Sequence, residues 1–153
     1  MPRAARPPSS PSSPSAGGLI GLPVATFADA LAFLLGLQHR FRRRFHAAVL
    51  LDGERRLVDG CVLTAKHHRA QDALAYVLPG PAVRGGGGQA LVFSAGHGPV
   101  GAPTDDDVEL WRTLVALAAE AGVVLLDWLA ADKKQIRSFA ITDRGGAAWD
   151  TPA

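Results

Sequence analysis

The sequence predicts a single α/β domain, and three observations support this fold class. The chain has 153 residues, which allow one substantial hydrophobic core but not two full domains. Apolar residues recur at helical spacing in three segments and form compact, strand-like runs in the others. These segments follow one another in the order helix, two strands, helix, strand, helix, two strands, without an internal repeat. Such a mixture of helices and strands within one domain is typical of the α/β class.

Residues 1–18 are expected to form a disordered tail. Pro, Ser, Ala and Gly dominate them and bury too little apolar surface to offset the entropy of ordering. Neither this tail nor any later segment has an apolar run long enough for a signal peptide or a membrane span. Cys61 is the only cysteine, so no internal disulfide is expected. The sequence therefore predicts a cytoplasmic protein with no membrane partner.

The first elements are a helix and a β-hairpin. The helix is predicted to begin at Thr26, which has the spacing of a capping box with the aspartate three residues later, and to end near Gly36. Two apolar runs, residues 47–51 and 56–63, flank Asp52-Gly53. Asp-Gly between two strand-like runs is typical of a tight hairpin turn. We therefore expect an antiparallel pair of strands here.

The middle of the chain predicts two helices around one buried strand. The spacing of apolar residues predicts a helix over 67–78, and Pro79-Gly80 ends it. The glycine-rich segment 81–88 is expected to form a loop, and residues 89–94 have the apolar character of a buried strand. A second capping-box pattern opens a helix over 104–121, and the glycine that follows is suited to its C-terminal cap.

Two closing strands complete the predicted domain. They are residues 123–130 and 136–142, joined by a short polar turn. The domain therefore covers residues 19–143, and the glycine-rich segment 144–153 is expected to form a flexible C-terminal tail.

Several of these segments share their order and approximate spacing with a known family. The best match comprises Pro103-Thr104-x-x-Asp107, the helix that it opens, Gly122, Leu125-Leu126-Asp127 and Ser138-Phe139. In these features the chain resembles the RadC-like JAB/MPN (JAMM) domain, over roughly Thr26 to Thr142. The resemblance implies a cytidine-deaminase-like JAB/MPN fold, in which about three helices flank a curved mixed β-sheet.

The family's metal motif is H-x-H-x(10)-D with a glutamate near the first strand. Three protein ligands then hold zinc and leave one position open for a water that the glutamate deprotonates. Counting back from Asp107 without a gap places Ser94 and Gly96 at the two histidine positions. The chain leading into the first predicted strand contains Arg42, Arg43 and Arg44, where the resemblance implies the glutamate. Trp128 stands where the family commonly has a histidine after Leu-Leu-Asp.

A shorter loop in the alignment would bring His97 to the first histidine position, with Gly98 at the second. The degenerate site therefore comprises Ser94, Gly96, His97 and Asp107, and its metal-ligand candidates are His97 and Asp107. The simpler interpretation is that Asp107 caps its own helix and that His97 is a polar loop residue. We expect a small, uncharged pocket beside these two residues. Ser94 has no partner that the sequence identifies as a catalytic base.

A basic run is the main positive feature of the sequence. His39, Arg40, Arg42, Arg43 and Arg44 alternate with Phe41 and Phe45. Such a cluster favours contact with phosphates, although the formal net charge of the chain is only +2. The alternative is a solvated edge in which arginine stems cover two buried phenylalanines.

Three hypotheses about function follow. The first is a RadC-like JAB domain that has lost metal-dependent hydrolase activity and acts as a binding or structural module, with a protein partner and no cofactor. The second is a divergent zinc-dependent hydrolase of the JAMM type, acting on a peptide, isopeptide or nucleic-acid bond through His97 and Asp107. The third is a DNA-associated protein, related to repair by family association, that binds nucleic acid through Arg40, Arg42, Arg43 and Arg44.

Overall fold

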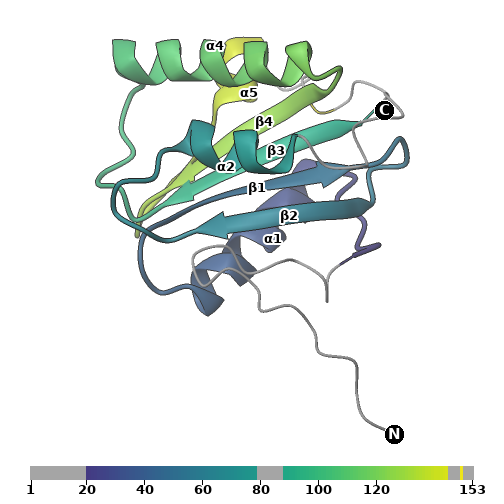
Figure 1. Cartoon of the computed structure of the whole chain (residues 1–153). Coiled ribbons are helices and arrows are strands. Elements are labelled where there is room, and N and C mark those ends of the chain that lie inside the picture. The colour runs from purple at the N-terminus through teal and green to yellow at the C-terminus, as the bar shows by residue number, and fades with distance from the viewer. Residues whose placement is uncertain (1–19, 79–87, 145–148, 150–153) are drawn as a thin grey trace, which may run out of the picture.

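The computed structural model describes residues 20–78, 88–144 and 149. The expected N-terminal tail and nearly all of the expected glycine-rich loop lie outside the described residues. Within them, the chain forms one five-stranded mixed sheet with helices on both faces (Figure 1). The α/β class expected from the sequence is therefore confirmed.

The strands are β1 (Phe45–Leu51), β2 (Leu57–Leu63), β3 (Gln89–Ala95), β4 (Val124–Ala131) and β5 (Ile136–Ser138), in the spatial order β2-β1-β3-β4-β5. β1 is antiparallel to both β2 and β3, β3 is parallel to β4, and β4 is antiparallel to β5. The carboxyl ends of β3 and β4 therefore meet the beginning of β1 at one edge of the sheet. In open sheets with helices, ligands commonly bind outside the carboxyl ends of the strands.

The described residues contain four helices, where the resemblance implies about three: α1 (Phe27–Arg40), α2 (Ala70–Val77), α4 (Asp105–Glu120) and α5 (Phe139–Arg144). Figure 1 shows α2, α4 and α5 on one face of the sheet and α1 on the other. Each face has its own apolar core. Alternate residues of β1 divide between the two cores, so that Ala48 and Leu50 point toward α2 and Ala47 and Val49 point toward α1.

The prediction that the first helix ends near Gly36 is wrong, because α1 continues to Arg40. Leu37, one residue beyond the glycine, is buried against the sheet, and its carbonyl accepts a hydrogen bond from the amide of Phe41 at 2.7 Å. Packing of this last turn outweighs the cost of a glycine inside a helix, which is only about 1 kcal/mol. The extension places Arg40 on the helix and Arg42 after it.

The β1–β2 connection is also longer than the tight Asp-Gly turn that the sequence predicts. The left-handed residue is Arg55, with φ of 58°, and Gly53 does not adopt a positive φ. The Asp52 carboxylate accepts hydrogen bonds from the amides of Glu54 and Arg56 and so closes a wider loop. The side chain of Asp52 therefore sets the turn, where the sequence pattern had favoured the conformational freedom of glycine.

The end of the domain also differs from two full strands. β5 has three residues, and α5 begins directly after it at Phe139. Asp127, which is fully buried on β4, organises this junction by accepting hydrogen bonds from the Ser138 hydroxyl, the Ala140 amide and the Trp149 indole. Trp149 lies within the segment expected to be a flexible tail, yet its side chain is buried. Residues 145–148 and 150–153 of that segment lie outside the described residues.

Candidate functional site

The candidate site is a cavity of about 290 Å³ at the carboxyl ends of β3 and β4, on the side of α2 and α4. Three of the sequence-predicted residues line it, namely Ser94 on β3, His97 on the loop that follows, and Asp107 in the first turn of α4. Gly96 points instead toward the opposite side of this loop. The fold therefore brings three of the four candidate residues to one cavity.

His46 is a central residue of this cavity that the sequence analysis missed. The register of the antiparallel pair β1–β3 sets His46 directly opposite Ser94, and the Nδ1 atom of His46 lies 2.7 Å from the Ser94 Oγ atom. Each is a polar residue within a mostly apolar strand, which is the signal that could have linked them. Burial, reinforced by the neighbouring His97, lowers the pKa of His46 to about 3. The imidazole is therefore neutral at physiological pH.

The hydroxyl of Ser94 has a second partner, because the indole Nε1 of Trp128 donates a hydrogen bond to Ser94 Oγ at 2.9 Å. Trp128 comes from β4, so the serine joins three strands of the sheet. Ser94 is 5% exposed. A hydroxyl that is buried and already accepts a hydrogen bond is a poor nucleophile, although His46 stands where a catalytic base would. The cluster His46–Ser94–Trp128 is thus a closed polar network within the core.

His97 covers this network from the solvent side. Its ring stacks on the ring of His46, with centroids 3.9 Å apart and planes at 10°. Its Nε2 atom lies 2.9 Å from the carbonyl oxygen of Phe45. Because a carbonyl oxygen only accepts, Nε2 of His97 carries the hydrogen in this contact and is not available to bind a metal. The Nδ1 atom is the nitrogen left to act as a ligand.

Asp107 forms the capping box that the simpler interpretation of the sequence predicts. Its Oδ2 atom accepts from the amide of Thr104 at 3.0 Å, and the Thr104 hydroxyl accepts from the Asp107 amide at 3.1 Å. Capping of α4 by Asp107 is therefore confirmed. The carboxylate is directed to the helix N-terminus, where it favours the exposed amides and the helix dipole.

The residues present do not fit a catalytic zinc ion. In the described part of the chain, no three His, Cys, Asp or Glu side chains are grouped so that they could hold a metal. Gly96 has φ of +80°, and a Cβ atom built there would lie 2.7 Å from the Cα atom of Arg44. A side chain at this position would therefore strain the loop and force the backbone at Arg44 to shift. Arg44 itself stands near the position where the resemblance implies the general base.

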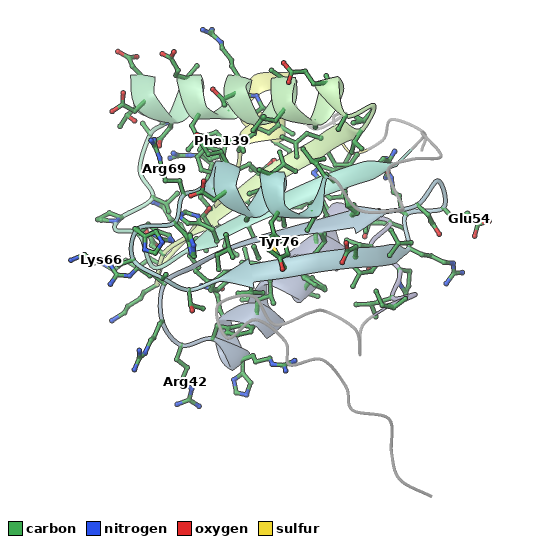
Figure 2. All side chains as sticks on the ribbon, in the orientation of Figure 1. Arg42, Glu54, Lys66, Arg69, Tyr76 and Phe139 are labelled. Atoms are coloured by element: carbon green, nitrogen blue, oxygen red, sulfur yellow. The ribbon has the colours of Figure 1, made fainter. Side chains whose placement is uncertain are left out.

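The expected uncharged pocket is also wrong, because two arginines line the cavity. Arg69, which precedes α2, and Arg137 on β5 both contribute to its wall. Figure 2 shows Arg69 on the side of the sheet that α2 covers, near Phe139. These two arginines bring positive charge to the cavity. No local sequence signal indicated this charge, because Arg69 and Arg137 come from elements far apart in the chain.

A second and larger cavity, of about 600 Å³, lies beside the first on the α1 side. Arg42, Arg43 and Arg44 from the predicted basic run line it, together with Lys133 and Lys134 of the β4–β5 turn. Arg40 lies on α1, with its guanidinium 5.7 Å from the ring centroid of Phe41. Figure 2 shows Arg42 projecting away from the sheet on the α1 side. From the sequence, Lys133 and Lys134 were predicted only to belong to a polar turn.

The fold and these two neighbouring cavities define a class of protein: an α/β domain with a mixed five-stranded sheet and polar sites at the carboxyl ends of its parallel strands. No protein-family model and no curated protein matches the chain. No helix in residues 20–78 or 88–144 is both long and apolar enough to cross a membrane.

Proposed function

We propose that this chain is a RadC-like JAB domain without metallohydrolase activity, which acts as a binding module. The observation that supports this proposal best is the closed network at the degenerate motif. Ser94 is hydrogen-bonded to His46 and Trp128, and Gly96 leaves no room for a ligand side chain beside Arg44. The two positions where the resemblance implies histidine ligands thus hold a hydrogen-bonded serine and a closely packed glycine.

Electrostatics oppose a metal at the same place. A catalytic zinc site has three protein ligands and one open position. Here His97 Nδ1 and the Asp107 carboxylate are the candidates, and Asp107 already caps α4. Arg69 and Arg137 line the cavity that holds His97 and Asp107, so their positive charge repels a divalent cation there. Arg44, near the position where the resemblance implies the general base, is a donor without an acceptor atom.

The positive cavities favour a role in binding. Arg69 and Arg137 outnumber Asp107 in the smaller cavity, and arginines and lysines from two segments outnumber Asp132 in the larger one. An excess of positive charge in a cleft concentrates ligands of negative charge. The DNA-associated function is therefore the second candidate, and the basic wall of the larger cavity is the specific feature that favours it.

Zinc content separates this proposal from the zinc-dependent hydrolase. Purified, untagged protein is analysed for zinc by elemental analysis, alongside the variants His97→Ala and Asp107→Asn, where the asparagine retains an oxygen that can cap α4. We expect far less than one zinc per chain in all three. A content near one zinc per chain that falls in both variants, while circular dichroism shows them folded, would overturn the proposal.

A further inference from the structure

The larger cavity has the features of a binding site with a charged rim and an apolar floor. Its rim comes from two segments that are far apart in the sequence, the chain after α1 and the turn between β4 and β5. Its floor comprises the buried Phe45 and Ala95, and the exposed Gly96 and Pro99 adjoin them. Its volume of about 600 Å³ lies within the range of small-molecule sites, roughly 300–1,000 Å³.

The cations of the rim are available to a ligand. Arg42, Arg43, Arg44, Lys133 and Lys134 are all exposed, and none of them forms an ion pair with a carboxylate in the described part of the chain. The carboxylate of Asp132 also lines the cavity, but it accepts hydrogen bonds from the amides of Val100, Lys134 and Gln135. These bonds lower its pKa and hold the turn that presents the two lysines. Five cations and one carboxylate leave a net charge of about +4 on the lining.

An aromatic ring stands beside these cations. Phe41 follows the last residue of α1, lines the cavity and is partly exposed. Its ring centroid lies 6.2 Å from that of the buried Phe45, which supports it from behind. An aromatic face among arginines is the combination with which proteins bind unpaired bases next to their phosphates.

We propose that this cavity binds a single-stranded nucleic acid segment. Arg42 and Arg43 on one side and Lys133 and Lys134 on the other contact successive phosphates, and a base enters the cavity against Phe41. The inference rests on the proposed binding function and names its ligand class.

The arrangement favours a single strand over other anions. One phosphate group neutralises at most two charges, whereas the rim presents cations from two separate segments. In a duplex the bases are paired and stacked inside, so they cannot reach an apolar floor, whereas an unpaired base can. An acidic peptide would meet the same cations but has no planar group to lie on Phe41.

The test is fluorescence anisotropy of a labelled decamer of deoxythymidylate with the full chain, at 50 to 300 mM NaCl. Three competitors are added separately: the same sequence in a duplex, decaglutamate and inorganic phosphate. We expect the decamer to bind most tightly. Four neutralised phosphates predict a slope of log K against log salt of about −2.8. Equal or tighter binding of decaglutamate or the duplex would overturn the proposal, as would failure of the decamer to bind at 50 mM salt.

Two double variants locate the site. Arg42→Ala/Arg43→Ala and Lys133→Ala/Lys134→Ala should each weaken binding at least tenfold at 50 mM salt and make the slope less negative by about 1.4. The matched control is Arg56→Ala/Arg112→Ala, which removes two exposed arginines that do not line the cavity. It should bind like the wild type. An unchanged lysine variant, or an equal loss in the control, would show that the cavity is not the site.

Variants of Phe41 distinguish binding that includes contact with a base from binding through charge alone. Phe41→Leu keeps apolar volume but removes the aromatic face, and Phe41→Trp retains a face. We expect the leucine variant to bind roughly fivefold or more weakly with an unchanged salt slope, and the tryptophan variant to restore binding. Equal affinity of the leucine variant and the wild type would refute the base contact. Zinc content, measured on the same preparations, tests the loss of the metal site independently, so the two proposals can fail separately.

Discussion

The two cavities lie next to each other but use polar residues in opposite ways. In the smaller one, His46, Ser94 and Trp128 satisfy one another inside the core. In the larger one, arginines and lysines surround an open space and form no ion pairs with the described carboxylates. A polar group that is buried and paired contributes to stability, whereas an unpaired exposed charge contributes almost nothing to it. We infer that the first site serves the fold and the second serves a ligand.

The largest effect on stability is expected at Asp127, another buried polar group whose hydrogen bonds are satisfied within the core. The Asp127→Ala substitution removes the acceptor that joins β4, the start of α5 and Trp149. We expect a loss of about 3 kcal/mol or more in the free energy of unfolding, because several buried donors lose their partner at once. Urea denaturation at pH 7 measures it. A loss below 1 kcal/mol would show that this junction is not cooperative with the core.

Gly96 lies between the two cavities and tests the steric argument against a metal ligand. A Cβ at Gly96 would meet the backbone of Arg44, whereas a Cβ at Gly98, which also has a positive φ, would meet nothing within 4 Å. We expect Gly96→Ala to destabilise by about 2 kcal/mol or more and Gly98→Ala by roughly 1 kcal/mol, since only the former adds a clash to the backbone strain. The midpoints of urea denaturation compare them. Equal costs would mean that the β1 entry moves aside easily.

Features that depend on residues close together in the sequence could be predicted. Both capping boxes, at Thr26 and Thr104, form as the spacing predicts. Each depends on residues three apart, so no tertiary information is needed. The end of α1 and the β1–β2 loop were misjudged because burial of Leu37 and the side chain of Asp52 outweighed the preference of glycine.

In both cavities, too, residues that are adjacent in the sequence were easier to predict than contacts that depend on the fold. The arginine run was visible because its members are adjacent, and it does line a cavity. The pairing of His46 with Ser94 depends on the register of β1 against β3, and the approach of Lys133 depends on the path of β4. Neither register nor path is determined by a short motif. The sequence thus predicted residues of both sites but not the partners that give them their roles.

Protonation of His46 offers a pH test of the satisfied network. Its pKa is lowered from 6.5 to about 3 by burial, with His97, His68 and Arg69 adding to the shift and Asp72 opposing it. A lowered pKa favours the neutral, folded form, so stability is complete above pH 6.5 and falls as the pH drops toward 3. At pH 5.5 the loss should be about 1.4 kcal/mol relative to pH 8.

The control for this test is His46→Asn, which does not titrate and retains a polar atom near Nδ1 to pair with Ser94. Burial raises the pKa of Asp127, so its protonation stabilises the fold as the pH falls, opposite to the effect of His46. Asp127 is present in both proteins, so its contribution cancels when the free energy of unfolding of His46→Asn is subtracted from that of the wild type. Urea denaturation of both proteins from pH 8 to 5 measures these two free energies. If the two curves run parallel, His46 is protonated without cost and the network is open to water.

The smallest effect on stability is expected at the open cavity, where Arg42→Ala/Arg43→Ala should change the free energy of unfolding by no more than about 0.5 kcal/mol. Five neighbouring cations with one carboxylate repel one another, so the change should be slightly stabilising at 20 mM salt and vanish at 300 mM, where the Debye length falls to a few ångströms. Thermal denaturation at both salt concentrations measures it, with Arg56→Ala/Arg112→Ala as the control outside the cavity.

A loss of more than 1 kcal/mol would mean that these arginines hold the fold together, and the contrast between the two cavities would then fail. A gain at low salt that disappears at high salt would mean that the cations are kept close together at a cost to the fold, as expected of charges that serve a ligand.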